Sequence, residues 1–397
     1  MQHMIRQNLH IPQGYKPSPL GIIPEDWEVK RLGEVCTFLD SQRIPIKDAD
    51  RSKMQGQYPY YGASGIIDHV NDYIFDDDLI LLGEDGANII TRSTPLAFLV
   101  SGKVWINNHA HVLKTNKGYN RYYICNYLES LTYDKYNTGT AQPKLNQEVC
   151  EHIPVLIPSE EEQYKISDLL TLWDTAIAKQ TQLIEKLTLR KKGLMQQLLT
   201  GKKRLKGFDG EAFHRLGNYI SECNRRNNGC KRVLSVTNTR GFILQEEQFD
   251  KIVASDDTSN YKVVRQGEFA YNPSRVNVGS LDMLNEYDEG ILSPMYIVFK
   301  ANEDIDKSYL LQCLQSWWFR GHIPAYTQGS VRDSLSFDGL CSMKFYIPSL
   351  EEQKAISNIL EQADKEIEIQ KQKLMGLQEQ KKGLMQLLLT GKKRINK

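Results

Sequence analysis

Residues 191–204 read KKGLMQQLLTGKKR, and residues 381–394 read KKGLMQLLLTGKKR. The two stretches differ at one position, and each matched pair is 190 residues apart. The match extends back without a gap, so that residues 157–205 and 347–395 share 27 of 49 positions. Self-similarity at a fixed offset is typical of a duplicated structural unit. The chain of 397 residues is therefore expected to consist of two related halves.

Each repeated segment has the pattern of one long helix. Pro158 and Ser159 supply a start, acidic residues fill the first turn, and Gly201 with three following cations supplies a stop. Between these ends, apolar residues alternate at spacings of four and three, which is the seam of a coiled coil. The predicted seam positions are Ile166, Leu170, Ile177, Gln180, Ile184, Leu187, Lys191 and Leu194 in the first helix, and Ile356, Leu360, Ile367, Gln370, Leu374, Leu377, Lys381 and Leu384 in the second.

The same two polar residues interrupt both seams, Gln180 and Lys191 in the first and Gln370 and Lys381 in the second. Polar seam residues lower stability but fix register and partner choice, so the two helices are expected to pair with each other within one chain. The alternative is that each helix packs on its own domain. At 1.5 Å per residue, helices of about 35 residues would form a rod of roughly 50 Å.

The rest of each half has the pattern of a mixed α/β domain. Strands are predicted at 73–75, 79–82, 96–100 and 103–106, followed by a helix at 121–131. The second half repeats this order, with strands at 267–271 and 294–299 and a helix at 308–319. The expected fold is α+β, with two tandem α/β domains joined by two long antiparallel coiled-coil helices in a pseudo-two-fold repeat. The predicted boundaries are 1–26 for an unassigned N-terminal segment, 27–156 and 207–346 for the two domains, and 157–206 and 347–397 for the two helical spacers.

Composition excludes several classes of protein. The chain is 40% hydrophobic and 25% charged, and no apolar run approaches the roughly 18 residues of a membrane span. The first residues lack an apolar signal core, so a cytoplasmic location is expected. Seven cysteines without a C-x-x-C pair argue against a disulfide framework and against a structural zinc site.

Charge is divided unevenly along the chain. The helical spacers carry 10 basic against 6 acidic residues and 10 against 7, whereas the two domains carry 13 against 16 and 15 against 18. Bulk charge therefore does not supply the domains with affinity for a polyanion. Any contact with nucleic acid must come from local placement of polar side chains.

Several motifs allow two interpretations. The T-G-K at 200–202 is not a phosphate-binding loop, because its glycines have the wrong spacing and it ends a helix. Asn272-Pro273-Ser274-Arg275 is similar to the N-P-P-Y motif of amino-methyltransferases, but it lacks the second proline and the aromatic residue. It is either a plain turn or a turn that hydrogen-bonds base edges.

Four further loops are candidates. His109 and His111 could form a metal pair, although a packed or hydrogen-bonded pair is favoured without a third ligand. Glu84 and Asp85 suit either a turn or acceptance of a hydrogen bond from cytosine. The loops at 139–144 and 329–334 recur in register but differ in polar side chains. Within them Gln142 would suit adenine and Arg332 would suit guanine, or both loops are simple polar turns.

Together these features resemble the specificity subunit of type I restriction-modification systems. The resemblance rests on R-L-G at 31–33 and 215–217, Y-G-A-S-G-I at 61–66, G-E-D-G-A-N at 83–88 and G-T-A-Q-P-K-L at 139–145, and on the two copies of I-P-S-x-E-E-Q and of the 191–204 stretch.

The resemblance implies a non-catalytic subunit whose two target-recognition domains each read one half of an asymmetric split site in double-stranded DNA. It implies two methylation subunits and further restriction subunits as partners, with S-adenosylmethionine, ATP and Mg serving those partners and no cofactor in this chain. The candidate DNA-contact residues are Ser64, Glu84, Asp85, Asn88, Asn108, Thr140, Gln142 and Lys144 in the first domain, and Asn238, Arg240, Asn272, Ser274, Arg275, Asn277, Ser330, Arg332 and Ser334 in the second.

Two rival hypotheses stay open from the sequence. A DNA-modifying enzyme, either a methyltransferase or a nuclease, would need a cofactor loop or a carboxylate–lysine cluster, and the sequence offers neither pattern. A coiled-coil scaffold for proteins alone would protect or methylate no DNA sequence.

Overall fold

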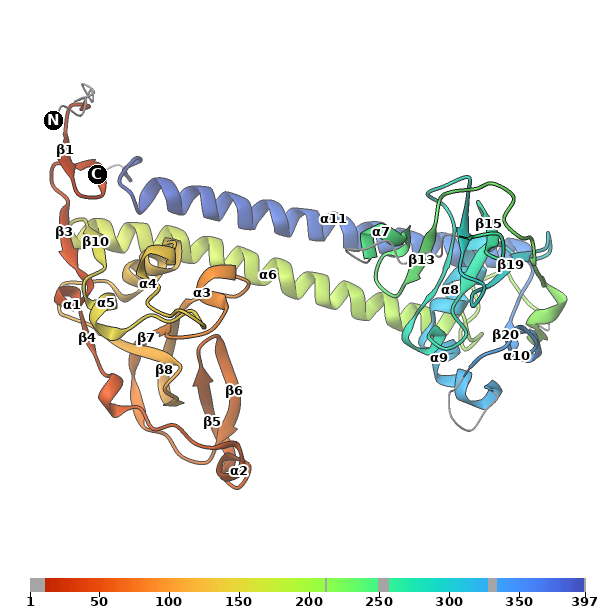
Figure 1. Cartoon of the computed structure of the whole chain (residues 1–397), viewed down its shortest axis with the longest axis horizontal. Coiled ribbons are helices and arrows are strands. Elements are labelled where there is room, and N and C mark those ends of the chain that lie inside the picture. Colours follow the sequence, from red (N-terminus) through yellow and green to blue (C-terminus); the bar gives the residue numbers. More distant parts are fainter. Residues whose placement is uncertain (1–10, 211–212, 249–256, 328–333, 396–397) are drawn as a thin grey trace. The chain divides into compact units, whose positions relative to one another are not determined.

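The computed structural model describes residues 11–210, 213–248, 257–327 and 334–395. The chain divides into two compact units, one of Met1–Gln180 with Lys373–Lys397 and the other of Thr181–Gln372. Two long helices cross this division, α6 (Glu160–Leu198) and α11 (Leu350–Leu388) (Figure 1). The first unit therefore includes the last turns of α11, which lie about two hundred residues from the rest of that unit in sequence.

The first unit is built on a six-stranded sheet of order β4-β9-β7-β8-β5-β6, with two smaller two-stranded sheets. Its elements before α6 are β1 (Tyr15–Ser18), β2 (Gly21–Pro24), β3 (Glu28–Arg31), α1 (Leu32–Val35), β4 (Cys36–Phe38), α2 (Asp48–Arg51), β5 (Gln55–Gly62), β6 (Gly65–Val70), β7 (Phe75–Gly83), α3 (Asn88–Thr91), β8 (Ala97–Ile106), β9 (Ala110–Thr115), α4 (Arg121–Ser130), α5 (Gln147–Glu151) and β10 (Pro154–Ile157).

The second unit contains a four-stranded sheet of order β12-β19-β16-β17 and three two-stranded sheets. Its elements between the long helices are β11 (Phe213–Arg215), β12 (Ile220–Glu222), β13 (Leu234–Thr237), β14 (Gly241–Leu244), α7 (Gln245–Gln248), β15 (Lys262–Arg265), β16 (Phe269–Tyr271), β17 (Leu281–Met283), β18 (Glu289–Leu292), β19 (Ile297–Ala301), α8 (Lys307–Gln315), α9 (Trp317–His322), α10 (Phe337–Ser342) and β20 (Lys344–Tyr346).

The two units share the topology of their central strands. Four strands of each sheet correspond: β4, β7, β8 and β9 in the first unit, and β12, β16, β17 and β19 in the second. Counted in chain order within each set of four, the first strand pairs with the fourth, the fourth with the second and the second with the third, all antiparallel. The sequence repeat is thus also a repeat of the fold, although sequence identity is concentrated in the long helices. This arrangement, with α4 and α8 as the helices that follow the sheets, confirms the predicted α+β fold class.

Each long helix contacts the helix that follows the sheet of its unit through equivalent hydrogen bonds. The backbone N–H of Asn120, which caps α4, donates to Gln163 Oε1 at 2.8 Å, and Ser167 Oγ donates to the Asn120 side chain at 2.9 Å. In the second unit the backbone N–H of Asp306, which caps α8, donates to Gln353 Oε1 at 2.8 Å. Gln163 and Gln353 are both about 1% exposed, so these bonds lie inside the packed core.

The long helices run antiparallel beside each other within each unit. In the first unit Lys381 Nζ of α11 donates to Asp174 Oδ1 of α6 at 2.6 Å, and in the second Lys191 Nζ of α6 donates to Asp364 Oδ1 of α11 at 2.6 Å. The two lysines are 190 residues apart, as are the two aspartates. Each lysine of the predicted seam therefore has an acidic partner on the other helix.

All sixteen predicted seam residues are buried or half-buried. The predicted helix stop also stands: both Gly201 and Gly391 have a φ of +69°, and each lies just beyond its helix. A positive φ suits glycine because it has no Cβ. The T-G-K stretch is thus a helix terminus.

Several local predictions were wrong. The strands predicted at 73–75 and 79–82 are one strand, β7, which begins only at Phe75. The helix predicted at 308–319 is broken at Ser316, whose Oγ accepts a hydrogen bond from the Phe319 N–H at 3.1 Å and so caps a second helix, α9. The strands predicted at 96–100 and 103–106 are one strand, β8, because its residues pair without a break with β7, from Ala97 with Leu82 to Val104 with Phe75.

None of the helices in the described part of the chain is both long enough and apolar enough to cross a membrane.

Candidate nucleic-acid interface

Three loops of the first unit meet at the end of β7. The backbone N–H of Glu84 donates to His109 O at 2.9 Å, and that of Leu145 donates to Glu84 O at 2.8 Å. Asp85 forms an isolated β-bridge with Lys144. The G-E-D-G, N-N-H-A-H and G-T-A-Q-P-K stretches, which are far apart in sequence, are therefore fixed to one another at a single edge of the sheet.

A buried network of charges supports this edge. Arg43 donates to Glu84 Oε2 at 2.6 Å and contacts Asp40 Oδ2 at 3.3 Å, while His111 Nδ1 lies 2.5 Å from Asp40 Oδ2. Burial opposes the charged form of His111, but the hydrogen bonds to Asp40 and Cys150 prevail and raise the pKa of His111 to about 10. Charged, fully hydrogen-bonded groups of this kind hold a loop rigidly.

Asp40, Glu84 and His111 are close enough to hold a metal ion together. However, the Arg43 guanidinium already contacts both carboxylates, so the network is neutralised by this chain's own cation. The predicted alternative of a hydrogen-bonded histidine pair is supported, because His109 instead contacts the Asp85 carboxylate at 2.8 Å. The two histidines thus have separate acidic partners.

The remaining candidates of the first unit lie on the surface of the same edge. Asn108, Thr140, Gln142 and Lys144 are exposed. Ser64, at the turn between β5 and β6, lines a shallow depression of about 450 Å³ together with Asp85 and His109. Four loops or turns of the first unit therefore present polar side chains on one side of its sheet.

The corresponding edge of the second unit is anchored in the same way. The backbone N–H of Leu335 donates to Pro273 O at 3.1 Å, and Tyr271 OH donates to Leu335 O at 3.2 Å. Leu335 is 190 residues after Leu145, whose N–H makes the equivalent bond to Glu84 O. The N-P-S-R turn of the second unit thus occupies the place that the G-E-D-G loop occupies in the first.

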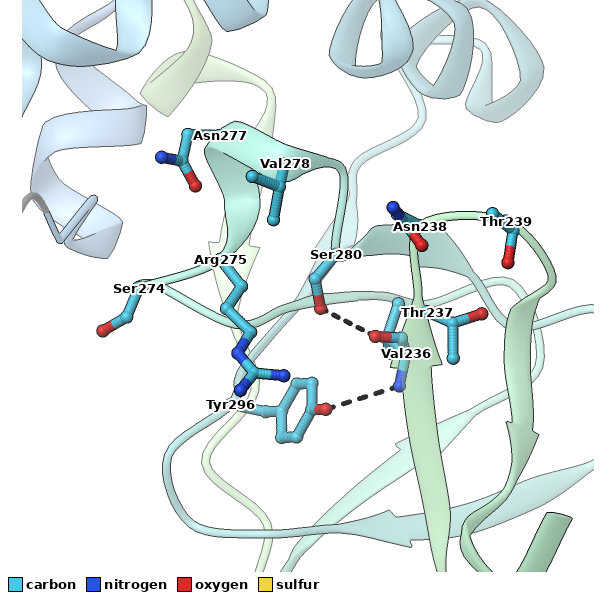
Figure 2. A pocket seen from close by; sticks show the side chains of 10 residues that line it. All are labelled: Val236, Thr237, Asn238, Thr239, Ser274, Arg275, Asn277, Val278, Ser280 and Tyr296. Atoms are coloured by element: carbon cyan, nitrogen blue, oxygen red, sulfur yellow. Dashed lines mark hydrogen bonds between the residues drawn. The ribbon is translucent and has the colours of Figure 1, made fainter. Parts of the chain in front are cut away.

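Four predicted residues of the second unit line one cavity of about 610 Å³: Asn238, Ser274, Arg275 and Asn277 (Figure 2). Sequence analysis did not select the other polar residues of its wall, Thr237, Thr239, Ser280 and Tyr296. A Thr-Asn-Thr run in the tight turn between β13 and β14 was a signal that could have indicated the first two of these.

Several predicted contact residues are instead used within the fold. Glu84 is about 9% exposed and binds Arg43 and Lys144, and Asn272 is about 8% exposed and accepts a hydrogen bond from the Ser274 N–H. Asn88 Oδ1 accepts from the Thr94 N–H, and Arg240 is paired with Glu247. These contacts favour supporting roles for the four side chains over the predicted contact with a base.

The loop at 329–334 lies mostly outside the described residues. Ser330 and Arg332 are in that segment, and Ser334, which follows it, is half-buried. The assignment of individual DNA-contact residues stays a prediction in both units.

The comparisons with known proteins agree on one protein family. The protein-family model of the type I restriction modification DNA specificity domain matches residues 24–189 and again 219–379. The specificity subunit of the type I restriction enzyme MjaVIII of Methanocaldococcus jannaschii is 26% identical, with 94% of each chain covered. A putative type I specificity subunit of Haemophilus influenzae is 34% identical over 36% of this chain and 37% of its own.

Solved structures show the same fold. The S subunit of a type I restriction-modification system from M. genitalium aligns with a TM-score of 0.55 at 13% identity, covering 91% of this chain and 96% of that one. A chain from a study of type I complex assembly aligns with a TM-score of 0.55 at 14% identity, covering 93% and 99%. Because the family model covers both halves, most of the chain is accounted for. This chain belongs to the family of type I restriction-modification DNA specificity proteins.

Proposed function

We propose that this chain is the DNA-recognition subunit of a type I restriction-modification complex, in which each of its two units reads one half of a bipartite site. The observation that carries the proposal is the repeated edge. In the first unit the loop after β7 is hydrogen-bonded to Leu145, which follows the loop at 139–144. In the second unit the loop after β16 is hydrogen-bonded in the same way to Leu335, which follows the loop at 329–334.

The side chains on these matched edges differ in chemistry. The first unit presents Asp85, Gln142 and Lys144, and the second presents Asn238, Ser274 and Arg275. Base pairs are distinguished in the major groove by their patterns of hydrogen-bond donors and acceptors. The two units thus share one backbone arrangement but present two different sets of side chains. This suits a protein that reads two different half-sites.

We further propose that the chain catalyses no reaction itself and works with two methylation subunits and with restriction subunits. S-adenosylmethionine, ATP and Mg would then serve the partner subunits. Both long helices carry exposed apolar side chains, among them Leu172 and Leu189 on α6 and Ile369 and Met375 on α11. The proposed methylation subunits would cover these side chains. The predicted boundaries of the recognition domains and spacers belong to the same proposal.

Long-read methylation mapping tests this function directly. The chain is produced in cells together with its proposed methylation subunit, and modified adenines in the genomic DNA are mapped. A motif of two short specified halves with an unspecified gap is expected. Methylation or cleavage of DNA by the purified chain alone would instead favour an enzyme, and a partnered chain that modifies no sequence would favour a scaffold.

A further inference from the structure

The cavity of the second unit contains an arginine that has no counter-ion among the described residues. The guanidinium of Arg275 makes no hydrogen bond or ion pair with any residue in the described ranges. In the part of the chain that the structure describes, no aspartate or glutamate lines the cavity. An exposed cation in a hollow without acidic neighbours is available for a ligand that presents hydrogen-bond acceptors.

The backbone that carries Arg275 is fixed. The Arg275 N–H donates to Asn272 O at 3.0 Å, and the Arg275 carbonyl accepts from Val278 and Ser280 at 3.1 Å each. The neighbouring Val276 is about 2% exposed and packs into the core of the unit. The start of the side chain is therefore held by the turn, and less conformational freedom is lost when it binds.

The opposite wall is fixed to the same turn. Ser280 Oγ donates to Val236 O at 2.7 Å, and the Val236 N–H donates to Tyr296 OH at 3.4 Å (Figure 2). The Arg275 side chain extends from the turn toward Tyr296 in this view. Asn238, at the tip of the β13–β14 hairpin, is exposed beside it. The cavity is thus a rigid hollow in which the Arg275 guanidinium lies next to the neutral side-chain amide of Asn238.

The equivalent place in the first unit has the opposite charge. There Asp85 follows Glu84, and its carboxylate is paired with the half-exposed His109 at 2.8 Å. Because Glu84 O and Pro273 O accept the equivalent backbone bonds, Asp85 corresponds to Ser274, one position before Arg275. The two units therefore present different donor and acceptor patterns from equivalent loops. A base that suits Arg275 would not suit Asp85.

We propose that Arg275 reads a guanine in the half-site bound by the second unit, donating two hydrogen bonds to O6 and N7 of that base. Guanine presents these two acceptors side by side in the major groove, and the arginine fork matches their spacing. This inference rests on the proposed DNA-recognition function. It assigns one base of one half-site to one residue, which that function alone does not do.

Binding measurements on the complex with the methylation subunit test the assignment. A duplex containing the mapped motif competes with duplexes in which each guanine of the second half-site is replaced by adenine. For the wild-type chain one replacement is expected to weaken binding by about 5- to 150-fold, the range for one bidentate contact. In Arg275→Ala that penalty should fall to nearly 1-fold, whereas penalties in the other half-site stay unchanged.

Arg275→Lys separates base reading from attraction to phosphate. Lysine keeps the charge but lacks the planar fork. It should therefore keep the salt dependence of binding and still lose most of the guanine preference. If Arg275→Ala instead weakens all duplexes equally and lowers the salt slope by about 1, Arg275 contacts phosphate and the inference is overturned.

Arg265→Ala is the matched control, since Arg265 is exposed in the same unit and does not line the cavity. It should leave every base preference unchanged. Full guanine preference in Arg275→Ala would overturn the inference while leaving the proposed function intact. Absence of any sequence preference in the wild-type complex would overturn both. Circular dichroism of each variant confirms that it is folded.

Discussion

Arg394, beyond the end of α11, is bonded to Glu162 at the start of α6. Its Nε and Nη2 donate to the two carboxylate oxygens at 2.7 Å each, and Trp27 Nε1 donates to Glu162 Oε2 at 3.0 Å. In the second unit Arg204, beyond the end of α6, is bonded to Glu352 at the start of α11 at 2.5 Å. Each copy of the T-G-K-K-R ending thus closes onto the beginning of the other long helix. This explains why the same ending occurs twice.

Removing the arginine should leave a buried carboxylate without its main partner. Glu162 is about 6% exposed, so Arg394→Met is expected to lower the free energy of unfolding by about 2 kcal/mol. Urea denaturation followed by tryptophan fluorescence measures the loss. Arg190→Met is the control, because Arg190 and Glu366 form an ion pair with both side chains about half exposed, worth less than about 0.5 kcal/mol. Equal losses in the two variants would contradict this role of Arg394.

The two glycines of one repeated stretch should respond to alanine in opposite directions. Gly201 has a φ of +69°, and an added Cβ would lie 2.6 Å from the Tyr346 ring, so Gly201→Ala should destabilise by more than about 1 kcal/mol. Gly193 lies inside α6 with nothing within 4 Å of its Cβ position, so Gly193→Ala should stabilise by about 0.5–1 kcal/mol. Thermal unfolding of both variants measures the difference. A stabilising Gly201→Ala would show that the helix does not end as described.

Local sequence patterns predicted the long helices well because their signals are local. The acidic first turn, the apolar repeat and the stop glycine each act within a few residues. The partners of Arg394 were not predictable in this way. Glu162 is 232 positions earlier in the chain, and only the closure of the first unit by the end of α11 brings the two together.

The candidate site was predicted in part for a similar reason. Asn238, Ser274, Arg275 and Asn277 were selected separately as polar loop residues, and the fold gathers them around one cavity. Glu84 was selected in the same way, but it turns inward because Arg43, which is 41 positions away, supplies its partner. Side-chain direction in a turn depends on such distant partners, and composition does not reveal them.

Stability should depend on the ionisation of Asp282 in β17. Burial raises the pKa of its carboxyl to about 6, against a hydrogen bond from the Met283 N–H that lowers it. The folded chain then binds a proton more tightly than the unfolded chain, so stability falls as pH rises from about 4 to about 6 and stays lower above that range. Asp282→Asn should therefore raise the free energy of unfolding by about 2 kcal/mol at pH 8 and change it little at pH 4.

Urea denaturation at both pH values measures this difference. Asp257→Asn serves as the control, since the Ser259 N–H lowers the pKa of the Asp257 carboxyl and its ionised form is favoured. No gain at pH 8 is expected for it. A gain for Asp282→Asn that is equal at pH 4 and pH 8 would contradict the assigned ionisation.

DNA binding by the isolated chain should be weak and sensitive to salt. The predicted recognition domains carry 13 basic against 16 acidic residues and 15 against 18, and phosphate neutralisation supplies most non-specific affinity. Binding in a gel-shift titration is expected to tighten by at least about tenfold when the methylation subunit is added, because that subunit would complete the contact with the backbone. Equal affinity with and without the methylation subunit would contradict this dependence of tight DNA binding on that subunit.

The central claim is that each unit reads its own half of the DNA site. It is tested most directly by mapping methylation in cells that contain the methylation subunit and a chain with Thr140, Gln142 and Lys144 replaced by alanine. All three side chains are exposed at the recognition edge of the first unit, so folding should be kept. One half of the methylated motif should become relaxed or altered, while the other half and the gap stay the same. An unchanged motif, or equal relaxation of both halves, would contradict it.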